Sequence, residues 1–393
     1  MAFTQTLLER GDVERMLDIR RAIHADPELS HAEFATRERV LNELEQAGLT
    51  AIRPVGPTGF AVDVLGRRAG SRTVGLRADM DALPIHETAN VPFRSRRAGV
   101  MHACGHDSHT AMVLAAGFWF QRHADRFGGR VRLLFQHSEE ALPSGAEQFV
   151  AAGLARDLDI VLGIHVDPMI GTGRVSAQPG PFACASDHFD VTIRGSAAHG
   201  GRPHEGIDAI AAAATFLQEA NRIRAHNADP MTPLVITAGT IAGGTAHNVI
   251  ADHVVIGGTI RSGGQSVRDV AHRRLREIAR GLELMHGVTA EVAIAEDGPL
   301  LVNDAGVAAL VRAAAVKVVG STEILSDAPM WSASDDFAYF SNAVSGTYFR
   351  IGVRHEAKGC VHPLHHPDFA IDEDALEIGA ALLIQATLDA LAA

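Results

Sequence analysis

The chain has 393 residues, 47% of them hydrophobic and 21% charged, which predicts a globular protein large enough for two domains. Its formal net charge of −12 gives no support to nucleic-acid binding. No apolar run reaches the ~18 residues of a membrane span, and the N-terminal segment lacks the pattern of a secretory signal. We therefore expect a cytoplasmic protein with no membrane or nucleic-acid partner.

The cysteines, the lysines and two absent sequence motifs exclude several classes of protein. Cys104, Cys184 and Cys360 are too few for a disulfide framework, and only Cys104 has metal-binding neighbours. Neither of the two lysines, Lys317 and Lys358, lies in a phosphate-binding loop, which excludes a P-loop nucleotidase. The chain also lacks the G-x-S-x-G turn of serine hydrolases and the G-x-G-x-x-G turn of dinucleotide-binding folds.

Apolar spacing predicts helices and strands in an alternating order. Two helices are expected within residues 13–47, broken near Pro27. A helix is expected after Asp107, and strands are expected at 60–64, 73–77, 131–135 and 160–165. This alternation predicts an α/β fold in which helices flank a sheet. Ligands in such folds bind beyond the carboxyl ends of the strands.

The rhythm changes between residues 185 and 297. The predicted order is strand, helix, strand, strand, helix, strand, at 189–193, 206–223, 234–241, 254–260, 267–284 and 288–294. That order is the ferredoxin-like motif. We therefore predict a small domain of residues 185–297, inserted into a larger domain that consists of residues 1–184 and 298–393.

One short segment is especially rich in metal-binding side chains. It runs from residue 101 to 109 and contains His102, Cys104, His106, Asp107 and His109. A lone Cys-Gly-His would be an ordinary turn. Thiolate and imidazole donors grouped in one run are instead typical of a transition-metal site.

Further polar residues stand at or after the ends of predicted strands. Asp79 and Asp81 are two residues apart, so in an extended backbone their side chains point to the same side. Glu139 and Glu140 form an adjacent pair, of which one can bind metal while the other transfers a proton. His165 ends another apolar run. Each could be a capping or solvated residue alone, but together with the metal donors they predict a catalytic metal site.

The predicted insert and the C-terminal part add four candidates. His199 is followed by two glycines, Asn248 follows a Gly-Gly turn, and Arg261 ends a predicted strand. These types suit recognition of an anion or an amide, since an arginine fork binds a carboxylate bidentately. The alternative is that they are turn residues and a surface arginine. Nearer the C-terminus, either His365 or His366 offers a late metal ligand.

Nine motifs in order carry a family resemblance. They are LRADMDALPIHE (76–87), MHACGHDSHTAM (101–112), FQHSEE (135–140), GIHVDP (163–168), AHGGRPH (198–204), GGTAHNVIAD (243–252), GTIR (258–261), DDFAYF (335–340) and LHHPDF (364–369). Nearly the whole chain resembles the amidohydrolase branch of the aminoacylase/carboxypeptidase G2-like metallopeptidases. That branch includes hippurate hydrolases and hydrolases of auxin–amino acid conjugates.

The resemblance implies a catalytic domain with a mixed sheet and two divalent ions per subunit, which could be Zn, Mn, Co or Ni. The implied metal ligands are Cys104, His106, Glu140, His165 and His365. His365 is chosen over His366 because the family pattern is Leu-His-x-Pro. The insert would act as a lid and a dimerisation domain, which implies a homodimer or a higher homo-oligomer.

The resemblance also implies roles for the remaining candidates. Glu139 would be the general base, and Asp81 would orient a ligand histidine. His199 would act on the reacting carbonyl, and Asn248 would also reach the site from the insert. Arg261 would bind the carboxylate of the substrate.

Three positions depart from the family pattern. Gln-His-Ser precedes the glutamate pair where Gln-Pro-Ala is common, Asp335 stands where Glu is common, and Ala251 stands where Pro is common. These changes affect loop shape more than metal ligation. They leave the reaction class intact and bear on substrate preference.

The implied reaction is hydrolysis of the amide bond of an N-acyl amino acid, which releases a carboxylic acid and a free amino acid. One alternative is a carboxypeptidase or dipeptidase acting on small peptides. Another is a deacetylase of amino-acid or cell-wall precursor metabolism. A third is a non-catalytic metal- or ligand-binding protein, against which the intact Glu139 beside a complete ligand set argues.

Overall fold

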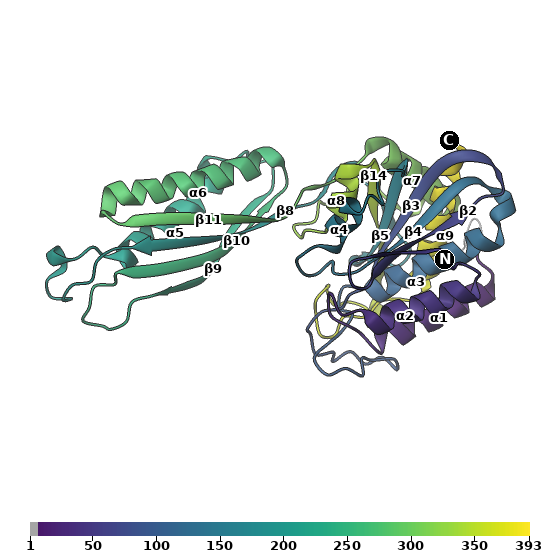
Figure 1. The fold of residues 1–393 in the computed structure, drawn as a ribbon, viewed down its shortest axis with the longest axis horizontal. Coiled ribbons are helices and arrows are strands. Elements are labelled where there is room, and N and C mark those ends of the chain that lie inside the picture. Colours follow the sequence, from purple (N-terminus) through teal and green to yellow (C-terminus); the bar gives the residue numbers. More distant parts are fainter. Residues whose placement is uncertain (1–6) are drawn as a thin grey trace. The chain divides into compact units, whose positions relative to one another are not determined.

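A computed structural model describes residues 7–393, so part of the N-terminal segment assessed above lies outside the described residues. The chain divides into two compact units (Figure 1). The first comprises Met1–Gly180, Val302–Pro329 and Tyr339–Ala393, and the second comprises Pro181–Leu301 and Met330–Ala338. The domain limits given above, with their assignment to a catalytic and an inserted domain, stay a prediction.

The first unit is built on an eight-stranded sheet with the order β1-β2-β4-β3-β5-β14-β6-β13. Its strands are β1 (Ile52–Val55), β2 (Gly59–Leu65), β3 (Arg68–Asp79), β4 (Gly128–Gln136), β5 (Ile160–Gly171), β6 (Val175–Ser176), β13 (Ile324–Leu325) and β14 (Gly346–Arg354). β3 is parallel to β4 and β5, whereas β2 is antiparallel to β1 and β4. The predicted fold class, α/β with a mixed sheet flanked by helices, is confirmed.

Helices cover this sheet. They are α1 (Arg10–His24), α2 (Phe34–Gln46), α3 (His106–Arg122), α4 (Gly145–Ala151), α7 (Ala305–Val319) and α9 (Asp374–Ala392). α3 and α9 both contact β3 and β4 and also contact each other, so they share one face of the sheet. Their apolar side chains form a buried core with the sheet, in which Leu114, Leu133 and Leu382 are fully inaccessible.

α9 is the one described helix that is long and apolar enough to cross a membrane by length and composition alone, with a mean hydropathy of 1.5. Within the protein, 72% of that segment is buried. It contacts β3, β4, β5 and β14. An apolar helix that is buried nearly all round is expected when it packs in the core of a large domain.

Strand register brings the candidate residues to one edge of the first sheet. Asp79 ends β3 and pairs with Gln136, which ends β4. The helix expected to begin after Asp107 begins at His106, before that residue. Gly105 precedes it with φ 90°, and a Cβ there would lie 2.4 Å from Cγ2 of Val166 in β5. Only glycine therefore lets α3 start so close to β5.

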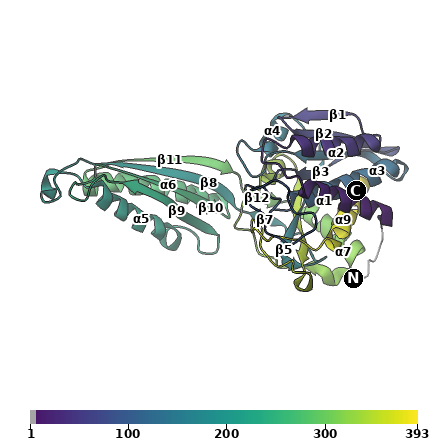
Figure 2. The ribbon, with the colours of Figure 1, turned by 90° about the horizontal axis from the view of Figure 1, so that it is seen from below.

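The second unit has a four-stranded antiparallel sheet with the order β11-β8-β10-β9. Its elements are β8 (Ala185–Arg194), α5 (Ala209–His226), β9 (Leu234–Gly243), β10 (His253–Ser262), α6 (Gln265–His286) and β11 (Thr289–Gly298). Both helices contact the sheet and each other, so they cover one face (Figure 2). Between them and the sheet lies a second core that includes Val191, Phe216 and Leu275.

The first helix of this unit begins later than its sequence pattern predicts. The expected start is residue 206, whereas α5 begins at Ala209. The Asp208 carboxylate accepts hydrogen bonds from the N–H groups of Ile210 and Ala211 at 2.9 and 3.1 Å. This N-cap satisfies two donors of the first turn, and it fixes the start of the helix.

The remaining elements are short. β7 (Gly180–Ala183) and β12 (Leu301–Asn303) lie where the chain passes from one unit to the other, and α8 (Phe337–Ala343) begins in the second unit and ends in the first. Single 3₁₀ turns are η1 (Ala124–Arg126), η2 (Pro203–Glu205), η3 (Ser321–Glu323) and η4 (Glu356–Lys358).

Candidate metal centre

The metal donors predicted from the sequence lie together in the first unit. Sets of donor atoms within 4.8 Å of one another are Cys104–His106–His165, Cys104–Glu140–His365 and His106–Glu139–Glu140. The sets share members, so all five predicted ligands and the predicted base belong to one connected cluster. Donors from four separate chain segments therefore meet at the edge of the sheet where β3 and β4 end.

His106 is oriented by the segment that follows β3. Its Nδ1 donates to the main-chain oxygen of Asp81 at 2.9 Å and lies 3.2 Å from Asp81 Oδ1. This contact places the ring proton on Nδ1 and leaves the lone pair of Nε2 directed at the cluster. His106 Nε2 lies 3.9 Å from Glu140 Oε1 and 4.0 Å from Glu139 Oε2. The contact is the kind that orients a metal-binding imidazole.

His165 is held in the same way by its own strand. Its Nδ1 donates to the main-chain oxygen of Val166 at 2.7 Å. Nε2 then faces Cys104 Sγ at a distance of 3.5 Å. Both side chains are buried. A buried thiol and an imidazole whose second nitrogen is fixed by a carbonyl form a typical pair of transition-metal ligands.

Two buried carboxylates, of Asp81 and Glu33, accept backbone N–H groups of the segment that carries Glu139 and Glu140. Asp81 Oδ2 accepts the Glu140 N–H at 2.9 Å, and it also accepts the Ser30 hydroxyl at 2.7 Å. Glu33 Oε1 accepts the Ser138 N–H at 2.8 Å. Burial opposes ionisation of Asp81, but hydrogen bonds from His106 and from the Glu140 N–H hold the pKa of its carboxyl below its usual value.

Ser138 is one of the positions that depart from the family pattern, and the structure gives it a role. It adopts φ 50°, a left-handed conformation that residues other than glycine rarely adopt. Its hydroxyl donates to the Ala141 carbonyl at 2.8 Å and lies 2.9 Å from His31 Nε2. These contacts, together with the Glu33 bond, hold the turn that presents Glu139.

His109, a metal donor by type in the opening motif, uses both ring nitrogens elsewhere. Nδ1 donates to Asp79 Oδ1 at 2.7 Å, and Nε2 accepts the Val166 N–H at 3.0 Å. Its ring packs edge-on against His165 with 4.5 Å between centroids. Asp79 also pairs with Arg77. His109 and Asp79 therefore buttress His165 from behind, although their atoms lie close enough to His106 to form another donor set.

The structure separates His365 from its neighbour His366. His365 Nε2 lies 3.4 Å from Glu140 Oε1, and half of its side chain is exposed. Its N–H donates to the Ala103 carbonyl at 2.9 Å, which ties its loop to the Cys104 segment. His366 instead stacks on His362 with 4.5 Å between ring centroids. Of the two histidines, His365 is the one that shares a donor set with Cys104 and Glu140.

The residues present fit divalent metal ions. His106 Nε2 and Glu140 Oε1 are buried and have no hydrogen-bond partner among the described residues. Buried polar atoms without partners are costly, and a metal ion would satisfy both. Burial and the Glu140 carboxylate raise the pKa of the Cys104 thiol well above its usual value. A coordinated ion would reverse this effect, because a coordinating thiol is deprotonated.

The candidates on the second unit have a different setting. His199 and Asn248 are exposed, and they are joined through the Gly200 N–H, which donates to the Asn248 carbonyl at 2.7 Å. His199 Nδ1 accepts the Gly201 N–H at 3.0 Å, so in the neutral ring Nε2 carries the proton and can donate. Arg261 is partly buried, and its Nη1 reaches only to the Ile260 carbonyl, at 3.3 Å.

Sequence reasoning missed the residues that hold the cluster from the N-terminal segment. Ser30 and Glu33 follow Pro27, where the pattern indicated only a break between helices. Behind α3, Asp107 pairs with Arg20 at 2.8 Å and with His24 at 2.9 Å, all three buried. Ser30 and Glu33 lie in the break between two helices, and Arg20 and His24 lie on the first of them, α1. Such residues cannot be paired from spacing alone.

The sequence and structure of the chain are similar to those of known proteins. Residues 75–389 match the profile of peptidase family M20/M25/M40. The chain belongs to this family. It is therefore a hydrolase that acts on amide bonds.

Two relatives and one solved structure show which proteins the chain is similar to. The chain is 39% identical over 272 residues to the N-acyl-L-amino acid amidohydrolase of Geobacillus stearothermophilus, covering 69% of this chain and 73% of that protein. It is 38% identical over 378 residues to thermostable carboxypeptidase 2 of Saccharolobus solfataricus, covering 94% and 95%. The crystal structure of a dinuclear metal-binding M20 peptidase from Bacillus subtilis has a TM-score of 0.86 and 28% identity, covering 98% and 99%.

Proposed function

We propose that this peptidase-family member hydrolyses the amide bond of N-acyl amino acids, releasing a carboxylic acid and a free amino acid. The observation that carries the proposal is Glu139 lying within one connected cluster of five metal donors, two of whose buried atoms have no hydrogen-bond partner among the described residues. Support for the substrate class comes from the amidohydrolase relative, which is named for N-acyl-L-amino acids.

The centre would hold two divalent ions, as the neighbouring B. subtilis peptidase does. Bound there, the ions would polarise the scissile carbonyl and lower the pKa of a water molecule towards ~7. The ligands would be Cys104, His106, Glu140, His165 and His365. Because one thiolate, three imidazoles and a carboxylate admit Zn, Mn, Co or Ni, metal availability would decide the identity.

Glu139 would act as the proton carrier. It would accept the proton of the attacking water and deliver it to the nitrogen of the leaving amine. The Ser138 N–H donates to Glu33 and the Glu140 N–H donates to Asp81, so the backbone is held on both sides of Glu139. Glu139 itself is only about a tenth exposed. This restricted setting favours proton transfer within the site over exchange with bulk water.

Residues of the second unit would bind the substrate. His199 Nε2, which carries the ring proton, would donate to the carbonyl oxygen as negative charge develops on it. Arg261 would bind the carboxylate of the amino-acid part, since its guanidinium has only one weak backbone contact in its own unit. Asn248, next to His199 in the loop pair, would hold the amide.

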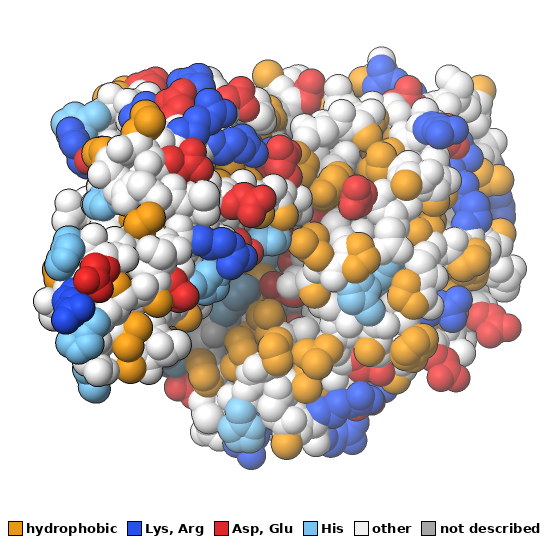
Figure 3. Space-filling view, turned by 60° about the vertical axis from the view of Figure 1, so that its left-hand side comes forward, with side chains coloured by type: hydrophobic (Ala, Val, Ile, Leu, Met, Phe, Trp, Pro, Cys, Tyr) orange, Lys and Arg blue, Asp and Glu red, His pale blue; other side chains and the backbone are white. Residues whose placement is uncertain are grey.

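The second unit would also act as lid and dimerisation domain. Supporting this proposal, β9 lies at the edge of its sheet, and Ile210, Ile241 and Val249 are exposed apolar residues of this unit. We infer a homodimer or higher homo-oligomer acting in the cytoplasm. Acidic and basic side chains are interspersed on the face shown in Figure 3, and the net charge of −12 gives no support to a nucleic-acid partner.

A carboxypeptidase activity on small peptides is the second candidate, favoured by the similarity to the S. solfataricus enzyme. Amine release from a panel of N-acyl amino acids and dipeptides separates the two. The panel is run on metal-stripped protein and on protein reloaded with Mn, Zn, Co or Ni. Metal-dependent cleavage of acyl amino acids supports the proposal. Cleavage of dipeptides alone would replace it with the peptidase function.

A further inference from the structure

The loop that carries His365 also carries a second set of donor atoms. His362, His366 and Asp368 each offer one donor, and the three donors lie within 4.8 Å of one another. The rings of His362 and His366 stack with 4.5 Å between centroids and 13° between planes. A neutral imidazole has one ring nitrogen with a free lone pair, so each of the two rings can supply one ligand atom to an ion.

The backbone holds these donors in place without any ion. Pro363 and Pro367 fix φ at two positions of the loop. The His365 N–H donates to the Ala103 carbonyl at 2.9 Å, and the Thr88 N–H donates to the Pro367 carbonyl at 2.9 Å. The loop is thus tied to the protein on both sides of His366. A donor set that is already held close loses little conformational freedom when it binds an ion.

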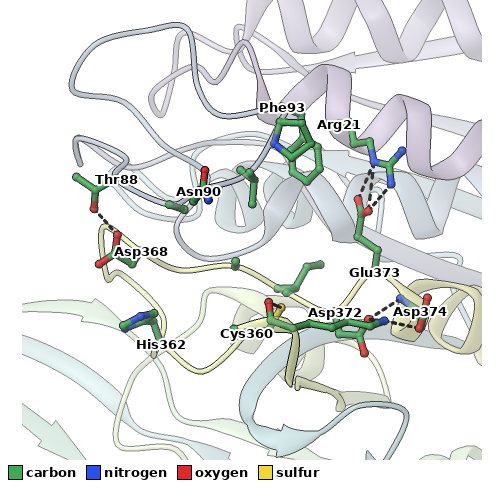
Figure 4. Close-up of a pocket in the computed structure, with 17 residues that line it drawn as sticks. Arg21, Thr88, Asn90, Phe93, Cys360, His362, Asp368, Asp372, Glu373 and Asp374 are labelled. Atoms are coloured by element: carbon green, nitrogen blue, oxygen red, sulfur yellow. Dashed lines mark hydrogen bonds and ion pairs between the residues drawn. The ribbon is translucent and has the colours of Figure 1, made fainter. Parts of the chain in front are cut away.

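The Asp368 carboxylate is oriented as a metal ligand would be. The Thr88 hydroxyl donates to Oδ1 at 2.5 Å, and Figure 4 shows this contact with His362 nearby on the same loop. Oδ2 lies 3.9 Å from His366 Nδ1. A tetrahedral ion with bonds of about 2.0–2.2 Å places neighbouring ligand atoms roughly 3.4 Å apart. Small side-chain rotations would close the gap, because both side chains are about two-fifths exposed.

Two features set the expected strength of binding. The Asp368 N–H donates to His366 Nδ1 at 3.0 Å, and ligation through that nitrogen would replace this bond. Three protein ligands also leave a fourth position for water. Access is open, because His362 and Asp368 lie on the wall of a cavity of about 670 Å³ (Figure 4). We therefore expect a weaker and more rapidly exchanging ion here than in the dinuclear centre.

We propose that His362, His366 and Asp368 form a third divalent transition-metal site. Two imidazoles and one carboxylate favour Zn, Co, Ni or Cu over Mg and Ca, which prefer all-oxygen ligands. The ion would link residues on both sides of His365 and would restrict the segment that presents His365 to the centre. By linkage, occupation of this site and of the ion bound to His365 would favour each other. That coupling rests on the proposed ligand role of His365, whereas the site itself does not.

The number of bound ions tests the proposal directly. Untagged, metal-stripped protein is dialysed against rising Zn(II), and bound zinc per chain is measured by mass spectrometry. We expect three ions for the unchanged chain and two for H366Q and D368N, with the third dissociation constant raised about tenfold or more in these variants. H226Q removes one exposed imidazole from the second unit and should still bind three. Absorption of the Co(II) form gives an independent count.

Two results would overturn the proposal. One is a count of two in the unchanged chain at saturating Zn(II). The other is a count of three in both H366Q and D368N, which would indicate adventitious surface binding. D368N keeps the side-chain volume and serves alone if H366Q does not fold. The difference of one ion between the chain and its variants does not depend on amide hydrolysis, so failure of the proposed function leaves this test valid.

Discussion

The two units prepare their functional side chains in different ways. In the first, Cys104, His106 and His165 are buried, and each imidazole has its second nitrogen fixed by a main-chain carbonyl. In the second, His199 and Asn248 are exposed on loops rich in glycine, and His199 Nδ1 accepts the Gly201 N–H. The metal ligands are therefore positioned before any substrate arrives. The residues proposed to bind substrate keep the freedom to adjust to it.

Replacing Glu139 tests the role of the first unit in proton transfer, and it should have the largest effect on turnover. We expect Glu139→Gln to lower kcat about 10²–10⁴-fold while the two central ions stay bound, because only proton transfer is lost. Turnover on N-acyl amino acids and metal content are measured together. Glu147→Gln, an exposed glutamate on α4, is the matched control. Wild-type turnover in the Glu139 variant would remove it from the mechanism.

Replacing Asp81 tests whether preorganisation of the ligands matters. We expect Asp81→Asn to weaken metal binding about 10–100-fold, since the carboxylate holds both His106 and the Glu140 N–H. Competition with a chelator of known affinity measures the change. The exposed Asp125→Asn in η1 should bind metal as the unchanged chain does. Equal metal affinity in the two variants would show that the cluster does not depend on Asp81.

Acid should destabilise the first unit through a buried histidine. Burial lowers the pKa of His102 to about 3, from 6.5 in the unfolded chain. Between these values the unfolded state binds a proton that the folded state does not, so stability falls as the pH falls below ~6.5. The single site predicts a loss of about 2 kcal/mol between pH 8 and pH 5.

Urea unfolding of metal-free protein at several pH values measures this loss. Trp119 lies in the first unit and Trp331 in the second, so Trp331→Phe leaves one fluorescent reporter in the first unit. His102→Leu should flatten the pH dependence, whereas His226→Gln should not. An unchanged slope in the His102 variant would assign acid sensitivity to other groups.

The smallest expected effect lies in the second unit. We expect Arg261→Ala to raise KM roughly tenfold for substrates with a free carboxylate, since one charge-assisted contact is lost, and to change kcat little. Steady-state kinetics on an acyl amino acid and on its amide form separate the two parameters. Arg224→Ala on the exposed end of α5 is the control. A fall in kcat without a rise in KM would place Arg261 in the chemical step instead.

Most of the fold could be predicted from the sequence because its signals are local. Helical spacing located α1 and α2, and strand patterns located β2 to β5 and the six elements of the second unit. Starts of helices were less accurate, since α5 begins where Asp208 caps it and α3 begins where Gly105 allows close approach to β5. Cap and close-contact geometry depend on atoms that spacing does not describe.

The kinds of donors, their order along the chain and the glutamate pair can be predicted from the sequence, because residue type decides which metals and which proton transfers are available. The packed structure was needed to show which nitrogen of each imidazole faces the cluster. It was also needed to show that His109 supports the site with both of its nitrogens engaged. It also revealed Glu33 bound to the Ser138 N–H, 105 residues away in sequence. Contacts between residues so far apart in the chain form only when the sheet and its helices pack, and no local spacing encodes them.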